Sequence, residues 1–178
     1  MKNFQGFTLV ELLVLLAIVA ILAVIAVPNF SATIKNDRDI SQVNALVDAL
    51  SLARSEAIKT GRFVTVCPGN TNACSDNNWS DGWIIFNGTP AAGASTTIRV
   101  FPALSGNNKL TPVPAATTIV FQSTGMTTLP PGNTINFTLC DGRSGTFARS
   151  VFLDSTGHAD SSPKMGYAID GTTALICP

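Results

Sequence analysis

The chain has 178 residues, of which 46% are hydrophobic and only 12% charged, and its formal net charge is zero. This balance excludes a strongly basic nucleic-acid-binding protein by composition, although it leaves room for a local basic patch. Low charge together with a mean hydropathy of +0.31 also argues against intrinsic disorder. The composition indicates that part of the chain lies in lipid or in a protein interior.

The first feature along the chain is a long apolar segment at residues 7–27, FTLVELLVLLAIVAILAVIAV, in which Glu11 is the single charged residue. As a helix it would extend roughly 31 Å, close to the ~30 Å hydrocarbon core of a bilayer. A cleaved secretory signal is the alternative, but its apolar region spans only about 7–15 residues. We therefore predict a membrane-spanning helix over residues 7–27.

Glu11 is unusual within this segment. A carboxylate costs ~2.5–3.5 kcal/mol at the bilayer centre and less near the interface. The positive end of the helix dipole offsets only a few tenths to ~1 kcal/mol of that cost. Glu11 is therefore expected to serve either the helix dipole alone or a cation that another chain supplies in an assembly.

The residues at the start of this segment form a compact motif. Residues 6–11 read G-F-T-L-V-E, which resembles the type III signal of type IV pilins and type II secretion pseudopilins. The resemblance implies that residues 1–6 are a leader and that a prepilin peptidase cuts after Gly6 and methylates the new amino terminus at Phe7. It also implies that Glu11 pairs with the terminal amine of a neighbouring subunit during assembly.

A second helical segment follows at residues 28–60. Pro28 lacks an N–H and its ring clashes with the preceding turn, so we predict a kink or break there. Beyond it, apolar residues recur at three- or four-residue steps, which predicts an amphipathic stalk helix. Thr60–Gly61 is the expected end, because glycine readily takes the left-handed cap. The apolar positions are Phe30, Ile34, Val43, Val47, Leu50, Ala53 and Ala57.

From residue 61 to residue 178 the composition changes to short Val-, Ile-, Phe- and Thr-rich runs bounded by turn residues, the pattern of strands. We predict an α+β fold in which the long N-terminal helix carries an antiparallel β-sheet head. The three-proline stretch 102–116 is expected to be a loop, and Asp170–Gly171 a tight hairpin turn. The predicted strands are 62–67, 82–87, 97–101, 117–122, 134–139, 149–153 and 173–177.

All four cysteines lie in the head, and an even count allows three pairings. We favour Cys67–Cys74, which closes a short loop, and Cys140–Cys177, which ties the last strand to a mid-domain strand. A head outside the cytoplasm favours oxidation. The spacing C-P-G-N-T-N-A-C differs from the usual zinc-ligand spacing, so no metal is predicted.

The head carries a second resemblance, to the GspH/FimT family of minor pilins and H pseudopilins. The segment W-S-D-G-W could equally feed a core and form a turn, and both interpretations can hold together. The positions that carry the resemblance are Cys67, residues 79–83, Phe86, Phe121, Gly125 and residues 155–157.

Membership would imply a structural subunit of the bacterial inner membrane, single-pass, with its head in the periplasm. Its partners would be other pilin or pseudopilin subunits, the prepilin peptidase and the membrane. It would join other minor subunits to prime or cap a type IV pilus, at the filament tip. The alternatives are pseudopilin H at the tip of a type II secretion pseudopilus and a DNA-binding FimT-type subunit.

The resemblance gives a specific test of DNA binding, because some FimT proteins are implied to bind DNA through G-R-x-R. Residues 157–160 here read G-H-A-D, so both arginines are replaced. Arg143, Arg149 and Lys164 lie nearby in sequence and form the alternative candidate patch. The head has as many acidic as basic residues, which weakens attraction for phosphate. DNA is therefore a possible but not a favoured partner.

An enzymatic function has little support. His158 is the single histidine, so a Ser-His-Asp arrangement would have to use it with Asp154 or Asp160. There is no G-x-S-x-G motif, no dinucleotide-binding glycine fingerprint and no P-loop lysine motif. We predict no catalytic residues and no cofactor.

Overall fold

The structure is a computed structural model that describes residues 7–69, 74, 78–89 and 96–177, and only the backbone of residues 25–29. The chain divides into two compact units, Met1–Asp37 and Arg38–Pro178. One α-helix is followed by eight strands and two short 3-10 helices within the described residues. In chain order these are α1 (Leu9–Thr60), β1 (Val64–Pro68), η1 (Trp79–Asp81), β2 (Trp83–Asn87), β3 (Thr97–Phe101), β4 (Lys109–Val113), β5 (Ile119–Phe121), β6 (Thr134–Cys140), η3 (Gly145–Phe147), β7 (Arg149–Asp154) and β8 (Ala159–Ser161).

Both ends of α1 follow from local chemistry. Thr8 caps the start: its hydroxyl oxygen accepts a hydrogen bond of 3.3 Å from the backbone N–H of Glu11, one of the unpaired donors of the first turn. At the other end Gly61 has a φ of +65°, the left-handed conformation that terminates helices. The predicted helix end at Thr60–Gly61 is confirmed.

Pro28 lies inside α1 rather than at a boundary, because the helix is continuous from Leu9 to Thr60. Of the two outcomes expected at Pro28, the break is absent, because a proline removes only one hydrogen bond of the helical series while the flanking turns keep theirs. The kink stays a prediction. Among the helices of the described residues, none is both long and apolar enough to cross a membrane. The membrane-spanning role of residues 7–27 stays a prediction.

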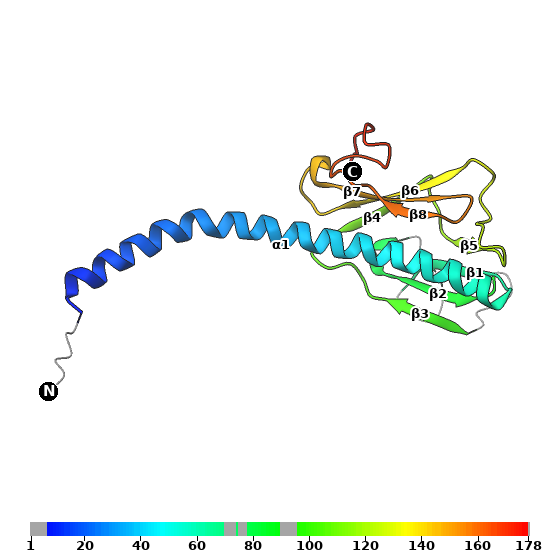
Figure 1. The fold of residues 1–178 in the computed structure, drawn as a ribbon, viewed down its shortest axis with the longest axis horizontal. Coiled ribbons are helices and arrows are strands. Elements are labelled where there is room, and N and C mark those ends of the chain that lie inside the picture. Colours follow the sequence, from blue (N-terminus) through cyan, green and yellow to red (C-terminus); the bar gives the residue numbers. More distant parts are fainter. Residues whose placement is uncertain (1–6, 70–73, 75–77, 90–95, 178) are drawn as a thin grey trace. The chain divides into compact units, whose positions relative to one another are not determined.

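The strands form two four-stranded sheets (Figure 1). The order is β3-β2-β1-β5 in the first sheet and β4-β6-β7-β8 in the second, and every neighbouring pair is antiparallel. An α+β fold with an antiparallel head is confirmed.

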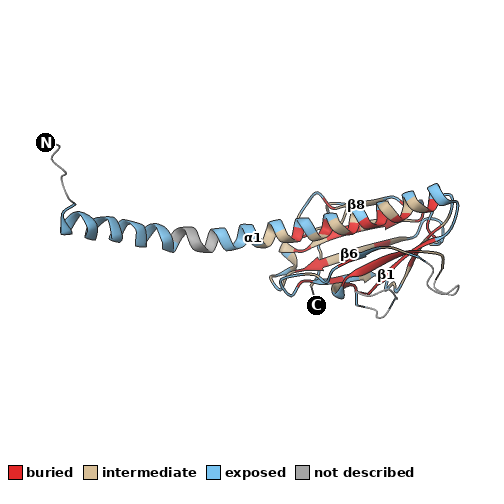
Figure 2. Ribbon diagram, turned by 90° about the horizontal axis from the view of Figure 1, so that it is seen from below, coloured by how far each residue is buried: buried red, intermediate tan, exposed pale blue. Residues whose placement is uncertain are grey.

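The core of the unit Arg38–Pro178 gathers the apolar face of α1 and residues of both sheets. The buried side of the helix faces the strands in Figure 2. In β6 the burial alternates along the strand, so Ile135, Phe137 and Leu139 point inward. Trp79 meets Phe137 edge to face, with ring centroids 4.9 Å apart. The buried helix residues recur at helical spacing, at Val43, Leu46, Ala49, Leu50, Ala53 and Ala57.

The W-S-D-G-W segment is structural and joins the two sheets. The indole N–H of the fully buried Trp79 donates to the carbonyl of Ala116 at 2.7 Å. The hydroxyl of Ser80 accepts from the backbone N–H of Leu110 in β4 at 3.0 Å. Gly82 has a φ of +101°, and a Cβ there would lie 2.4 Å from the carbonyl oxygen of Phe101. Only glycine fits this turn.

The prediction of a loop over residues 102–116 is wrong, because this stretch contains β4. Pro112 belongs to β4, which is an edge strand, and an edge strand needs no inter-strand N–H on its outer side. Leu110 is buried and anchors the strand against the core. The short strand β8 was also not anticipated.

The predicted strand 173–177 is likewise wrong. The described residues there form one isolated bridge, Tyr167 to Ala174. The backbone of this segment bonds instead to the preceding loop, since the N–H of Ala168 donates to Thr173 at 2.9 Å and the N–H of Leu175 donates to Gly166 at 2.8 Å. The expected turn at Asp170 is present, since its carboxylate accepts from the backbone N–H groups of Thr172 and Thr173 at 3.0 and 2.9 Å.

Candidate functional site

The first candidate site is the start of α1, residues 7–11. The Thr8 hydroxyl accepts from the backbone N–H of Glu11, and the side-chain carboxylate of Glu11 takes no part in this cap. Glu11 is exposed, and within the described residues no ion pair includes it. Gly6, the predicted cleavage position, lies outside the described residues. The arrangement leaves an acidic group accessible to another chain at the first turn of an apolar helix.

The helix surface around this carboxylate is apolar and uncovered. Phe7 and Leu9 are each 74% exposed, and Leu15, one turn after Glu11, is 47% exposed. Exposed apolar surface that is this continuous marks contact with another protein or with lipid.

The second candidate site is a polar cluster between α1 and the β6–β7 connection. Asp39 is 2% exposed although it belongs to the helix. Its carboxylate accepts from the side-chain amide of Asn108 at 2.7 Å and from the Arg143 guanidinium at 3.1 Å. The same Asn108 amide donates to Gln42 at 2.6 Å. A buried charge that is paired and hydrogen-bonded in this way fixes the helix to the second sheet.

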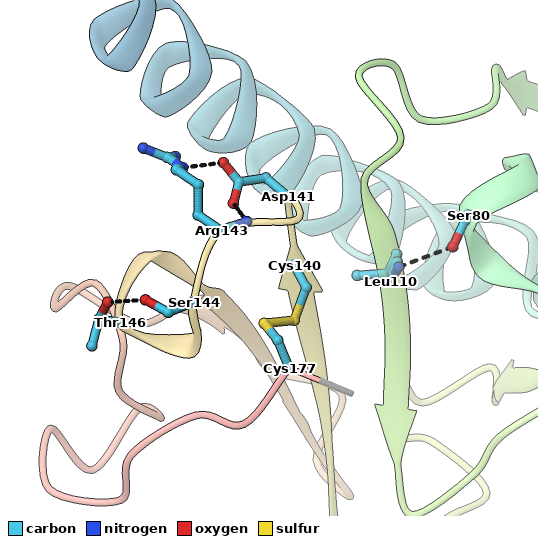
Figure 3. The surroundings of a disulfide bond; sticks show 8 residues. All are labelled: Ser80, Leu110, Cys140, Asp141, Arg143, Ser144, Thr146 and Cys177. Atoms are coloured by element: carbon cyan, nitrogen blue, oxygen red, sulfur yellow. Dashed lines mark hydrogen bonds and ion pairs between the residues drawn. A yellow bond between two sulfur atoms is a disulfide. The ribbon is translucent and has the colours of Figure 1, made fainter. Parts of the chain in front are cut away.

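Arg143 serves two carboxylates at once. Its Nε donates to Asp141, towards which its guanidinium points in Figure 3, while Nη2 donates to Asp39. The guanidinium carbon also lies 4.4 Å from the centroid of the Phe147 ring. The positive charge of Arg143 is therefore used within the protein.

The pKa values of the two carboxylates move in opposite directions. Burial raises the pKa of Asp39, the neighbouring Asp141 raises it further, and Asn108 and Arg143 only partly offset this. Burial also acts to raise the pKa of Asp141, but hydrogen bonds from the backbone and guanidinium of Arg143 outweigh it and lower the value. Of these two carboxylates, Asp39 is therefore the one that is protonated first as the pH falls.

The three cations considered for DNA binding come to the same end of the second sheet. Arg143 lies in the β6–β7 connection, Arg149 begins β7, and the segment after Lys164 is bonded to that end by the N–H of Gly166, which donates to Ala148. Arg143 is neutralised by its carboxylates. The Lys164 ammonium lies 3.5 Å from the Tyr167 ring centroid. Arg143 and Lys164 thus have partners within the protein, whereas none of the ion pairs among the described residues includes Arg149.

The turn that follows β7 replaces the G-R-x-R motif. The carboxylate of Asp154 accepts from the hydroxyl of Thr156 at 2.6 Å and from the backbone N–H of His158 at 3.0 Å. The imidazole of His158 takes no part in these bonds and the residue is exposed. The Asp154–His158 contact is thus a turn cap and not part of a catalytic triad.

The disulfide pairing is the favoured one. Cys67 bonds Cys74 over a separation of 7 residues, and Cys140 bonds Cys177 over a separation of 37. Figure 3 shows the second bridge holding the C-terminal segment against the end of β6. All four sulfurs are consumed by these bonds, so they bind no metal.

Sequence reasoning missed the Asp39 cluster. Asp39 lies four residues before Val43, which starts the buried stripe of the helix, so it falls on the same face. An acidic residue on an apolar face signals a buried partner. That signal was present in the sequence, but the identity of the partners, Asn108 and Arg143, was not.

Two family models match the chain. The model described as type II transport protein GspH matches residues 42–157. The model of the prokaryotic N-terminal methylation motif matches residues 1–27. No curated protein matches the chain.

Two crystal structures of the type IV minor pilin FimU of Pseudomonas aeruginosa strain PAO1 are similar to it. One has a TM-score of 0.60 and 19% identity, and covers 72% of this chain and 91% of FimU. The other has a TM-score of 0.57 and 20% identity, and covers 69% and 91%. Likeness at this identity shows a shared fold.

Proposed function

Because the chain belongs to the GspH family of minor pilins and pseudopilins, we propose that it assembles with other minor subunits to prime or cap a type IV pilus. The observation that carries the proposal is the start of α1. There an exposed carboxylate with no partner among the described residues, Glu11, stands on an uncovered apolar helix within the N-terminal methylation motif. The matched families are structural subunits, and the chain acts through contacts rather than through chemistry of its own.

Maturation and anchoring form part of the proposal. A prepilin peptidase removes residues 1–6 and methylates the amine of Phe7. Residues 7–27 hold the chain in the inner membrane in a single pass, with the head in the periplasm, until assembly. The support is the apolar run itself and the match of the methylation motif to residues 1–27. Intact mass of the membrane-extracted protein tests the cleavage: a retained Met1, or a cut near Ala26, would be incompatible with it.

In the assembled state Glu11 pairs with the terminal amine of a neighbouring subunit. A charge pair in an apolar environment is strong only when complete, and removal of one partner leaves the other desolvated and unpaired. Glu11→Gln should therefore leave insertion and cleavage normal but prevent incorporation. Asp48→Asn is the matched control, since Asp48 is an exposed acidic residue on the same helix.

The experiment uses a strain without the gene, complemented by the full chain or by either variant. Filaments are counted by electron microscopy, and incorporation is measured by co-purification with the other minor subunits. The wild-type chain and Asp48→Asn should restore filaments, and Glu11→Gln should not. Full piliation without the gene, or normal incorporation of Glu11→Gln, would refute the proposal.

A second candidate is the H pseudopilin at the tip of a type II secretion pseudopilus. The description of the matched family model, type II transport protein, favours it. The same deletion strain separates the two functions. Loss of secreted substrates with intact pili would assign the chain to the secretion system.

A further inference from the structure

A pocket of about 360 Å³ lies between the end of α1 and the β7–β8 turn. On the helix side it is lined by Ser51, Arg54, Ser55 and Ile58, whose spacing of three, four and seven places them on one face. Residues 157–159 form the opposite wall. We call it the Arg54 pocket. The pocket belongs entirely to the unit Arg38–Pro178.

Arg54 has no acceptor in the part of the chain that the structure describes. Its Nε is buried without a hydrogen-bond partner, and none of the ion pairs there includes it. A buried donor left unsatisfied is costly, and more so when the group is charged. Arg143, by contrast, is matched by two carboxylates. Arg54 therefore has no carboxylate partner among the described residues, whereas Arg143 has two.

Two glycines bring backbone close to the side chains of this pocket. A Cβ on Gly125 would lie 2.6 Å from Cδ1 of Ile58 and 3.2 Å from Nε of Arg54. A Cβ on Gly157 would lie 2.1 Å from the carbonyl oxygen of Gly125. Both glycines have φ values near +80°. The Gly125 backbone therefore packs close to the Arg54 side chain, and a side chain restricted by such packing loses less entropy when it binds.

An apolar edge adjoins the cation. Ile58 is 53% exposed and Met126, the residue after Gly125, is 45% exposed. An arginine beside exposed apolar side chains is the composition of protein-binding hot spots, where Arg and Met are enriched.

We propose that the Arg54 pocket receives an acidic side chain of a neighbouring pilin-type subunit, whose apolar residues cover Ile58 and Met126. This rests on the proposed function as an assembly subunit and names one of its contacts. Charge complementarity argues for the carboxylate, since the pocket offers one unmatched guanidinium. DNA is a poorer occupant because its phosphates need a row of cations, and Arg54 is the single Arg or Lys among the residues that line the pocket.

The test converts the cation into a group that can be linked to a carboxylate. The full chain carrying Arg54→Lys is expressed in its own host, and membranes are treated with a carbodiimide, which joins an amine to a contacting carboxylate as an amide. Arg62→Lys is the matched control, since Arg62 is exposed just after the same helix. Mass spectrometry of co-purified subunits then identifies the linked residues.

We expect an amide from position 54 to an Asp or Glu of another pilin-type subunit, and none from position 62. In parallel, Arg54→Gln should weaken co-purification about tenfold or more relative to Arg62→Gln, because a charge-assisted hydrogen bond is lost. Both results together would support the pocket as a subunit contact.

Three results would overturn the inference. If the chain co-purifies with subunits but position 54 links to nothing or only to its own carboxylates, the inference fails while the assembly function stands. If Arg54→Gln abolishes binding of a duplex DNA oligomer and no subunit adduct forms, the occupant is nucleic acid. If neither wild type nor variant co-purifies with any pilin-type subunit, the proposed function fails first and this contact with it.

Discussion

Replacement of Arg143 by alanine should be one of the most damaging single changes on the surface of the head. The guanidinium joins Asp39, which is 2% exposed, to Asp141, and its own side chain is 17% exposed. Without it two carboxylates face each other with only neutral donors around them. Loss of a buried partner costs about 3–5 kcal/mol, and we take about 3 because the arginine is not fully buried. The contact with the Phe147 ring adds about 0.5–1 kcal/mol.

The expected loss of about 3.5–4 kcal/mol is a large part of the 5–15 kcal/mol that typically holds a domain together. Urea denaturation of residues 29–178, which contain every buried residue of the core, measures it by circular dichroism. Arg62→Ala is the control, since Arg62 is exposed and should change stability by less than about 0.5 kcal/mol.

Two further variants test the cause. Arg143→Lys should recover part of the loss, because an ammonium keeps the charge but not the fork that reaches both acids. Asp39→Asn combined with Arg143→Ala should be more stable than the sum of the single changes predicts, by about 1–2 kcal/mol, since the unpaired buried charge is gone. Additive effects, or a loss below about 0.5 kcal/mol for Arg143→Ala, would refute the account of a buried, paired Asp39.

Three other predictions concern the turns and bridges of the head. Gly82→Ala should lower the unfolding temperature more than Gly132→Ala does. Both positions have positive φ, but the new Cβ would meet backbone at Gly82, whereas nothing lies within 4 Å of it at Gly132. Equal effects would count against the close contact. Replacing both cysteines of the 37-residue bridge at Cys140 by serine should cost about 4 kcal/mol, against about 2 kcal/mol for the 7-residue bridge, on the chain-entropy estimate; the reverse order would contradict it. The pKa of Asp170 is lowered to about 2, chiefly by the hydroxyl of Thr173 and then by backbone N–H groups. The contribution of Asp170 to stability is therefore complete above the ordinary carboxyl pKa near 4 and is lost as the pH falls towards 2. An NMR titration midpoint near 4 would show that these hydrogen bonds do not form.

The single-sequence evidence for DNA binding weakens once the structure is known. In sequence, Arg143, Arg149 and Lys164 lie close enough to form a patch, and they do share one end of the second sheet. Their availability depends on what faces them. Arg143 is opposed by Asp39, which is remote in sequence and lies in the helix. Pairing with a residue of another element is invisible to a local charge count.

The features that depend on local pattern could be predicted from the sequence. The motif at residues 6–11, the helical spacing that continues to Thr60, and six of the eight strands follow from periodicity, capping and turn residues. Four cysteines allow three pairings, and the predicted pairing, Cys67–Cys74 with Cys140–Cys177, is confirmed. The family could be recognised from the same short segments.

The features that depend on partners far apart in the chain could not be predicted in this way. Pro112 can belong to β4 only because that strand lies at an edge. Residues 173–177 remain irregular because their backbone bonds to the loop at residues 166–168 and Cys177 is tied to Cys140. Asp39 can stay buried because Asn108 and Arg143, both from the head, donate hydrogen bonds to its carboxylate. The Nε of Arg54 has no acceptor because no described residue places one beside it. Strand order and charge pairing are set by contacts between distant segments, and no local propensity encodes them.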